Sequence, residues 1–355
     1  MRPPQVLPNI HIGDRVVGSG EPVYVIAEIS ANHHQSYDKA LSLIGAAAAA
    51  GADAVKLQTY TPESLTLESD APPFQIGKGT QWEGRRLFEL YQEAMTPWEW
   101  QAGLKAASED LGMQCFSTPF DKEAVDFLVA LGVPAMKVAS FEMVDLGLIE
   151  TIAETKLPLL MSTGMASIAE IDAAVASARN AGSEEILLFR CNSAYPASPS
   201  EMDLRTIPHM MTTWDVPVGL SDHTLGVTAA VTAVALGACA IEKHLTLTRD
   251  DPGPDSAFSV EPEEFATLVR SVHEAEEALG DVRYGPSPSE IPSLAFRRSL
   301  FVVADVENGE TFTSQNVRSI RPGGGLPPAT LPVVLGRRAA RRVDAGTPLT
   351  WEMIQ

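Results

Sequence analysis

The chain has 355 residues, of which 45% are hydrophobic and 20% are charged, and this balance excludes disordered, fibrous and disulfide-stapled classes of protein. Its formal net charge of −20 argues against a general nucleic-acid binder, because neutralising phosphates requires clustered lysine and arginine. Three cysteines, Cys115, Cys191 and Cys239, form no C-x-x-C spacing, so we expect no disulfide framework, no structural zinc and a reducing, cytoplasmic location. Residues 1–20 lack the apolar core of a signal peptide, and no later run is long enough to span a bilayer, so a membrane partner is not expected.

The charge is distributed unevenly along the chain. Residues 286–355 contain eight arginines, no lysine and six acidic residues, a net charge of +2, which leaves −22 for residues 1–285. A Pro/Ser-rich stretch, GPSPSEIPS, coincides with this change and is typical of a semi-rigid linker. We therefore expect a large domain over residues 1–284, a linker over 285–295 and a small domain over 296–355.

Short β-rich runs alternate with Ala-rich stretches of helical period between Val23 and Leu247, the pattern of repeated βα units around a parallel sheet. Eight such runs predict strands at residues 23–30, 52–60, 114–120, 135–140, 158–164, 186–193, 217–223 and 238–247. Helices are predicted after them, for example over residues 38–50, 122–131, 167–181 and 262–279. Eight units in about 250 residues favour a closed (β/α)8 barrel over a doubly wound sheet, which would carry fewer strands and a Gly-rich turn after the first.

Two segments depart from this repeat. About 35 residues, 61–95, separate the second strand from its helix, and a connection of that length is usually a lid or a binding loop. This segment contains Trp82, Arg85 and Arg86, which can stack on a ligand or contact an anion. The tail after the linker contains two β-like pieces, SLFVVADV and LPVVLG, separated by turn signals.

Nearly every predicted strand ends in a polar residue, and the C-terminal ends of the strands are where a (β/α)8 barrel builds its active site. Strand ends of any barrel face solvent, so one polar residue there carries little meaning. A convergent set of lysines, histidines and glutamates is different, because such groups are rarely buried without partners. The set comprises Glu28, Lys56, Gln58, Ser117, Thr118, Lys137, Ser140, Ser162, Thr163, Asn192, Ser221, Asp222, His223, Glu242 and His244.

Two histidines end the last two strands of the predicted barrel. His244 lies two residues after Glu242, so the alternation of side chains along a strand points both to the same face. His223 ends the neighbouring strand, which brings the two imidazoles close together. Two neutral imidazoles with open positions suit a first-row divalent ion that polarises a carbonyl group better than a closed structural zinc site.

Two lysines lie among small hydroxyl side chains at other strand ends. Lys56 and Lys137 supply point charges, and the serines and threonines nearby supply hydrogen-bond donors, a combination suited to an oxyanion with many acceptors. A phosphorylated small acid is therefore the expected ligand. The alternative is a Schiff base, because a barrel lysine with a depressed pKa can attack a carbonyl carbon, and that chemistry would make the protein an aldolase or lyase.

A series of motifs in chain order resembles the sialic acid synthase family: AEISANHH, GADAVKLQTY, FSTPFD, MKVAS, MSTGMAS, CNSAYP, GLSDHT, IEKHLTL and GPDS, followed by RPGGGL in the tail. The resemblance runs nearly end to end. It implies a (β/α)8 barrel followed by a small C-terminal antifreeze-like (SAF) domain, assembled as a domain-swapped homodimer. The implied reaction is the condensation of phosphoenolpyruvate with an N-acetylated amino sugar.

The resemblance also implies roles for individual residues. His223 and His244 would hold Mn²⁺ or Mg²⁺. Phosphoenolpyruvate would be bound by Lys56, Thr118, Lys137, Ser140, Ser162, Asn192 and Ser221. Glu28, Gln58 and Asp255 would lie near the sugar and the metal, and Tyr195 would bind substrate. Glu28, Glu142 and Glu242 would be the catalytic carboxylates, and Arg321 would reach from the tail of one subunit into the barrel of its partner.

Three segments are most similar to the branch of the family that forms pseudaminic acid: TPESLTL, WEGRRLFELYQEAMTPWEW and GPDSAFSVEPEEF. This likeness implies 2,4-diacetamido-2,4,6-trideoxy-L-altrose as the sugar, with apolar contacts from Trp82, Ala257 and Phe258. Synthases of N-acetylneuraminic or legionaminic acid are the alternatives within the family. An ice- or carbohydrate-binding role for the tail is disfavoured, because no flat array of threonines repeats there.

Overall fold

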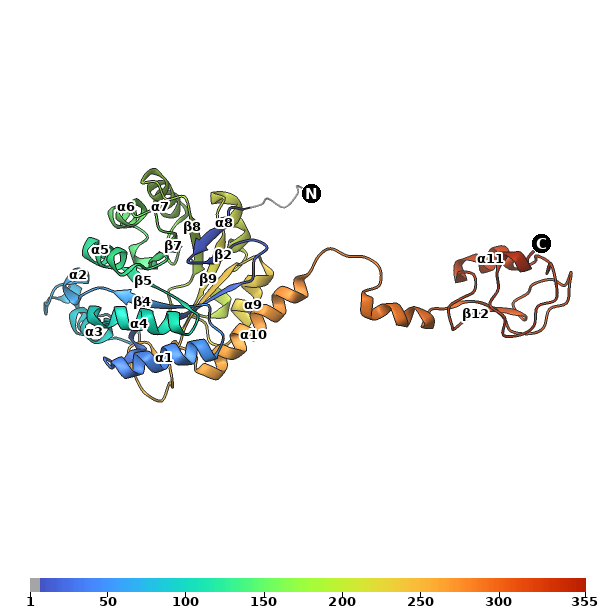
Figure 1. The fold of residues 1–355 in the computed structure, drawn as a ribbon, viewed down its shortest axis with the longest axis horizontal. Helices are drawn as coiled ribbons and strands as arrows, with labels where there is room; N and C mark the ends of the chain where they lie inside the picture. The colour runs from blue at the N-terminus through green and yellow to red at the C-terminus, as the bar shows by residue number, and fades with distance from the viewer. Residues whose placement is uncertain (1–6) are drawn as a thin grey trace. The chain divides into compact units, whose positions relative to one another are not determined.

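Eight parallel strands close into a barrel, which confirms the predicted fold (Figure 1). The computed structural model describes residues 7–355. The first six residues of the stretch 1–20, which is predicted not to be a signal peptide, therefore lie outside the described residues. The strands are β3 (Tyr24–Glu28), β4 (Ala54–Thr59), β5 (Gln114–Pro119), β6 (Met136–Val138), β7 (Leu159–Ser162), β8 (Ile186–Cys191), β9 (Val218–Asp222) and β10 (Ala240–His244). Each pairs with its neighbour in sequence, and β10 closes the ring against β3, with His244 opposite Glu28.

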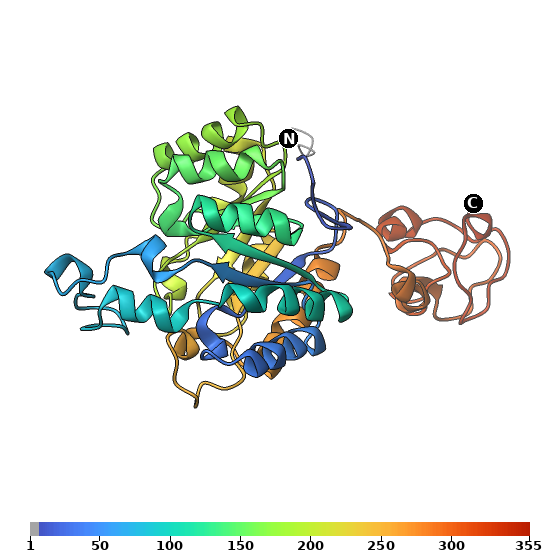
Figure 2. The ribbon, with the colours of Figure 1, turned by 60° about the vertical axis from the view of Figure 1, so that its left-hand side comes forward.

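Helices surround the strands and bury their apolar faces against them (Figures 1 and 2). They are α1 (Tyr37–Ala49), α4 (Trp98–Asp110), α5 (Lys122–Leu131), α6 (Leu146–Glu154), α7 (Ile168–Asn180), α8 (Thr206–Trp214), α9 (Thr228–Ala235) and α10 (Pro262–Leu279). Side chains at several N-termini accept hydrogen bonds from the first turn, as Asp121 does for α5 and Ser167 for α7. Within residues 7–355, no helix is both long enough and apolar enough to cross a membrane.

A short antiparallel hairpin, β1 (Ile10–Ile12) and β2 (Arg15–Val17), precedes the barrel. Its apolar side chains belong to the barrel core, and its polar side chains bond residues just before or at the start of strands. Arg15 pairs with Asp53 at 2.7 Å, and Asp14 accepts a hydrogen bond from Gln114 at 2.9 Å. The hairpin therefore covers the N-terminal end of the barrel and leaves the opposite end open.

The long segment between β4 and α4, predicted as a lid or binding loop, contains two short helices (Figures 1 and 2). They are α2 (Pro62–Leu65) and α3 (Leu87–Ala94), with a 3-10 turn at Pro72–Phe74 between them. Because the segment follows the C-terminal end of β4, it lies at the end of the barrel that the hairpin leaves open.

The chain divides into two compact units, the first ending at Gly280 and the second comprising Asp281–Gln355. The second unit has its own buried core, which includes Leu300, Phe312 and Val334, and an antiparallel pair of strands, β11 (Ser299–Val302) and β12 (Val317–Ile320). The β-like reading of LPVVLG is wrong, because its first four residues form the short helix α11 (Leu331–Val334). Pro332 lies in the first turn of this helix, where a backbone N–H has no partner within the helix, so the N–H that proline lacks is not needed there.

Candidate active site

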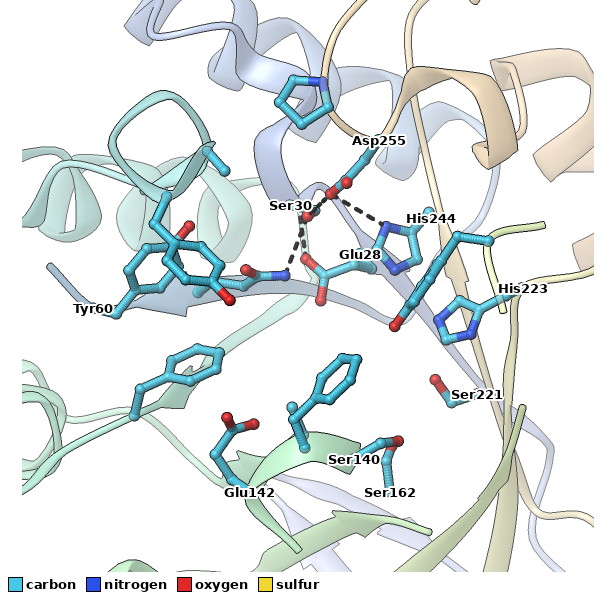
Figure 3. A pocket seen from close by; sticks show the side chains of 18 of the residues that line it. Glu28, Ser30, Tyr60, Ser140, Glu142, Ser162, Ser221, His223, His244 and Asp255 are labelled. Carbon is cyan, nitrogen blue, oxygen red and sulfur yellow. Dashed lines mark hydrogen bonds and ion pairs between the residues drawn. The ribbon is translucent and has the colours of Figure 1, made fainter. Parts of the chain in front are cut away.

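A cavity of about 370 Å³ opens at the C-terminal end of the barrel. From the set predicted by sequence it brings together Glu28, Lys56, Gln58, Lys137, Ser140, Glu142, Ser162, Tyr195, Ser221, His223, Glu242, His244 and Asp255. These side chains come from β3, β4, β6, β7, β9 and β10 and from the loops that follow β6, β8, β9 and β10, and Figure 3 shows several of them facing one space. Nearly all the strands of the barrel therefore contribute to one site.

Two lysines and two glutamates form a buried charge network at the base of this cavity. Lys137 Nζ lies 2.6 Å from Glu242 Oε2, and Lys56 Nζ lies 3.3 Å from Glu242 Oε1 and 2.5 Å from Glu28 Oε2. All four side chains are buried, so each charge depends on its partners rather than on water. The network is a compact cluster of two cations and two anions.

The network shifts the pKa of each member. Burial alone would raise the pKa of Glu242, but the charges of Lys137 and Lys56 hold it well below its usual range. Burial lowers the pKa of Lys137 to about 8, against the opposing pull of Glu242. For Lys56, burial opposes the charge, but Glu242 and Glu28 together raise its pKa. Burial raises the pKa of Glu28. Glu242 is thus the carboxylate that stays ionised, and Lys137 is the lysine nearest to losing its proton.

Three serine hydroxyls lie around these charges, and one of them lacks a partner. Ser221 donates to Glu242 Oε1 at 3.1 Å, and Ser140 Oγ accepts a hydrogen bond from Gly164 N at 3.2 Å. Ser162 Oγ is buried without any hydrogen-bond partner. A buried hydroxyl without a partner is costly, so Ser162 Oγ is poised to bond a ligand beside the lysines.

Two predicted phosphoenolpyruvate contacts do not line the cavity. Thr118 is buried behind Lys56 and accepts a hydrogen bond from its ammonium at 3.4 Å, so it positions that lysine. The Asn192 side chain holds its own loop: it donates to Glu201 O at 3.1 Å and accepts from Ala194 N at 2.9 Å. The backbone carbonyl of Asn192, rather than its side chain, bonds a residue of the cavity wall, His223.

The two histidines lie side by side, with ring centroids 5.3 Å apart (Figure 3). His223 Nδ1 lies 2.8 Å from Asn192 O, and because a carbonyl can only accept, this nitrogen carries a proton. Burial opposes the charge of His223, but Cys191 and the bond to Asn192 O raise its pKa, so Nε2 can coordinate an ion only once the ring is neutral. His244 Nδ1 is buried without a hydrogen-bond partner. Two imidazole nitrogens free to coordinate fit a divalent ion.

The protein alone supplies an incomplete coordination shell at these histidines. Within residues 7–355, no group of three or more His, Cys, Asp or Glu side chains is arranged to hold a metal ion. The nearest carboxylate oxygen, Asp255 Oδ2, lies 4.0 Å from His244 Nδ1. An ion at this pair would keep several positions for water and substrate oxygens, as catalytic sites do.

A chain of hydrogen bonds joins Asp255 to β3 and β4. Ser30 Oγ donates to Asp255 Oδ2 and accepts from Gln58 Nε2 at 3.1 Å, while Ser30 N donates to Glu28 Oε1 at 2.7 Å (Figure 3). Sequence reasoning missed Ser30, although it ends the strand predicted over residues 23–30, because only Glu28 was selected as the polar residue at that strand end. Its place two residues after Glu28, which the alternation along a strand puts on the same face, was the available signal.

Other polar strand-end residues point away from the cavity. Asp222 pairs with Lys243 at 2.7 Å, and Ser117 Oγ lies 2.6 Å from Thr59 Oγ1, all of them buried. Thr163 donates to Phe189 O at 2.9 Å. The alternation of side chains along each strand sends Asp222 outward and its neighbours Ser221 and His223 inward. These outward groups stabilise the wall of the barrel.

Glu142 borders the cavity on the side away from the histidines (Figure 3). Its Oε2 atom is buried without a hydrogen-bond partner, and burial raises the pKa of this carboxyl to about 7. Arg321 belongs to the second unit, where it is exposed just after β12.

The cavity has an apolar wall that is larger than the contacts predicted from Trp82, Ala257 and Phe258. It comprises Tyr60, Leu65, Ile76, Trp82, Leu87, Leu90, Tyr91, Ala94, Phe120, Phe141 and Phe258. Trp82 and Phe258 were expected there, whereas Ala257 is exposed and does not line the cavity. Most of the wall comes from residues 61–95, and the apolar positions of α3 (LFELYQEA) were a signal that could have indicated it.

Comparison with known proteins places the chain in a family. Residues 43–284 match the NeuB family and residues 297–355 match the SAF domain. A pseudaminic acid synthase of Campylobacter jejuni is 42% identical over 92% of this chain and 95% of its own length, and an N,N'-diacetyllegionaminic acid synthase of Legionella pneumophila is 35% identical over 95% and 96%. The crystal structure of an N-acetylneuraminic acid synthetase from Leptospira borgpetersenii, in complex with citrate, superposes with a TM-score of 0.72 at 31% identity, covering 81% of this chain and 95% of that one. The resemblance read from the motifs is thereby confirmed, and the chain belongs to the NeuB family with a SAF domain at its C-terminal end.

Proposed function

We propose that the chain is a transferase that condenses phosphoenolpyruvate with 2,4-diacetamido-2,4,6-trideoxy-L-altrose, forming pseudaminic acid and phosphate. The observation that carries this proposal is the cavity, in which two buried lysines and an unpartnered serine hydroxyl face a pair of imidazoles. The product is the one for which the Campylobacter jejuni relative, 42% identical, is named. The cytoplasm is the proposed location.

The polar end of the cavity supports binding of phosphoenolpyruvate. Lys56 and Lys137 supply positive charge for the phosphate and carboxylate groups, and Ser162 supplies a free donor. Residues held this rigidly cost little reorganisation, so they orient carbon 3 of the bound molecule toward the sugar. A divalent ion at His223 and His244 would supply a Lewis acid for the aldehyde oxygen of the open-chain sugar.

Two carboxyl groups, those of Glu242 and Glu142, have different proposed roles in the reaction. Carbon 3 forms the new bond to the aldehyde carbon, water adds at carbon 2, and phosphate leaves with cleavage of the carbon–oxygen bond. Glu242 stays ionised and therefore suits electrostatic stabilisation of the cationic character that develops at carbon 2. Glu142, with a pKa of about 7, suits the exchange of a proton near neutral pH, because a catalytic acid or base works best with a pKa near the working pH.

The sugar preference tests the proposal directly. With phosphoenolpyruvate and Mn²⁺ present, we expect 2,4-diacetamido-2,4,6-trideoxy-L-altrose to give a nine-carbon acid, identified by mass, with kcat/KM at least about tenfold above that for N-acetylmannosamine. The reason is that N-acetylmannosamine presents an extra hydroxyl to a partly apolar cavity and lacks one acetamido group. Equal or better use of N-acetylmannosamine would contradict the choice of sugar. Borohydride trapping of a lysine adduct with substrate would instead support the aldolase alternative.

We further propose a homodimer in which Arg321 of one subunit serves the barrel of the other. The charge split between the two parts of the chain, +2 against −22, favours such a contact. Mixing an Arg321→Ala subunit with a Lys137→Ala subunit should then restore about a quarter of the wild-type activity, because half of the dimers are mixed and each has one intact site. Each variant alone is the control. Absence of restored activity, after subunit exchange has been shown, would contradict action across the dimer.

A further inference from the structure

The cavity has two chemically distinct ends. One end holds the buried charges and imidazoles described above. The other end is walled by Leu65, Ile76, Leu87, Leu90 and Phe120, which we call the apolar compartment. Four of these five residues belong to the segment between β4 and α4, and Phe120 directly follows β5.

Aromatic side chains fix the shape of the apolar compartment. The Tyr60 ring lies edge-on to Phe120, with centroids 5.2 Å apart, and edge-on to Tyr91, with centroids 6.0 Å apart. Tyr60 is buried, and its backbone carbonyl accepts a hydrogen bond from Trp98 Nε1 at 3.1 Å. Leu90 is also buried, on the inner face of α3. The compartment is therefore preformed and rigid on this side.

Two side chains at the tip of the segment bond the loop that follows β10. Gln81 Nε2 and Trp82 Nε1 both donate to the same acceptor, Pro254 O, at 2.9 and 2.8 Å. Pro254 precedes Asp255, which lies beside His244. The Trp82 ring also lies 5.7 Å from that of Tyr195. The tip of the segment is thus bonded to the loop that carries part of the polar end.

We propose that the apolar compartment binds the apolar substituents of the sugar, namely its acyl methyl groups and the methyl group at its deoxygenated end. This inference rests on the proposed function and names what determines its choice of sugar. The lysines and the serine proposed to bind phosphoenolpyruvate lie at the polar end, so the sugar chain extends from the reacting carbon toward the apolar compartment. A methyl group there gains burial, whereas a hydroxyl group loses its hydrogen bonds to water.

Leu87→Asn tests the inference, with Leu67→Asn as the matched control. Leu87 lines the compartment, while Leu67 lies in the same segment, is 64% exposed and does not line the cavity. We expect Leu87→Asn to lower kcat/KM for 2,4-diacetamido-2,4,6-trideoxy-L-altrose about tenfold, to change N-acetylmannosamine less, and to leave the KM for phosphoenolpyruvate unchanged. Leu67→Asn should behave as the wild type. Equal values for the two variants with the diacetamido sugar would overturn the inference.

Trp82→Phe is a second variant that does not depend on Leu87. It keeps an aromatic ring beside Tyr195 but removes the N–H group that bonds Pro254 O. We expect its KM for the diacetamido sugar to rise at least threefold while its KM for phosphoenolpyruvate stays at the wild-type value. An equal rise in both KM values, or a change in neither, would count against a role in sugar choice for the segment that Trp82 bonds to Pro254 O.

Calorimetric binding of the two sugars separates this inference from the proposed function. If the wild type forms no product with either sugar, the proposed function fails, and binding then decides the role of the compartment. Weaker binding of the diacetamido sugar by Leu87→Asn than by Leu67→Asn would support it. Equal binding by both variants, or no binding of either sugar by the wild type, would overturn it.

Discussion

Lys137→Met should lower kcat/KM for phosphoenolpyruvate by about 10²- to 10³-fold, the usual cost of removing one preorganised electrostatic contact from a buried site. Lys137 is 1% exposed, so no water molecule replaces its charge, and methionine keeps most of its volume. Glu242 retains Lys56 and Ser221 as partners, so the variant should still fold, which a thermal unfolding curve checks. The matched control is Lys122→Met on the surface of α5, where the lysine pairs with Asp126.

The pH dependence gives this prediction a second readout. A lysine whose pKa burial lowers to about 8 is charged below that pH and loses its charge as the pH rises through it. The wild-type kcat/KM for phosphoenolpyruvate should therefore fall as the pH rises through about 8, because that parameter reports groups of the free enzyme. The Lys137→Met variant should lack this fall. A variant within a few-fold of the wild type, or one that keeps the same alkaline fall, would show that Lys137 does not bind the substrate.

The barrel could be predicted because its strands and helices differ in period. Eight buried β-rich runs, each followed by an Ala-rich stretch of helical period, leave few arrangements other than a closed ring. The hairpin of residues 10–17 could not be predicted in this way, because strands of three residues are too short to establish a period. Likewise LPVVLG has β-branched residues typical of a strand, yet a single helical turn forms there in the core of the second unit.

Much of the candidate site could be predicted because strand ends of a barrel converge whatever their distance in sequence. Lys137 and Glu242 are about a hundred residues apart and form an ion pair at 2.6 Å. Whether a strand-end side chain faces the cavity depends on its register, so Ser221 lines it while Asp222 does not. The apolar compartment was harder to foresee, because its residues lie on a non-repeating segment whose path depends on tertiary contacts such as the bonds to Pro254 O.

Removal of divalent metal should abolish turnover, and Mn²⁺ should restore it. The reason lies in the two histidines: His223 donates from Nδ1 to a carbonyl, which leaves Nε2 as the nitrogen that can coordinate, and His244 Nδ1 is buried with no hydrogen-bond partner. Burial holds the pKa of His244 well below its usual value, so its imidazole is neutral and able to coordinate at physiological pH. Loss of both imidazoles should therefore remove metal affinity as well as activity.

The His223→Ala/His244→Ala double variant, measured against His209→Ala, checks this explanation. His209 is exposed on α8, away from the cavity, so its removal should change neither metal binding nor rate. We expect the Mn²⁺ affinity of the double variant, titrated after chelator treatment, to be more than ~100-fold weaker than that of the wild type. Loss of an outer-shell partner alone can weaken metal affinity by up to ~100-fold. Thermal unfolding without added metal would show whether the double variant is folded. A folded double variant that binds Mn²⁺ as tightly as the wild type would show that the metal binds elsewhere. A folded double variant that turns over at the wild-type rate after chelation would show that the reaction needs no metal.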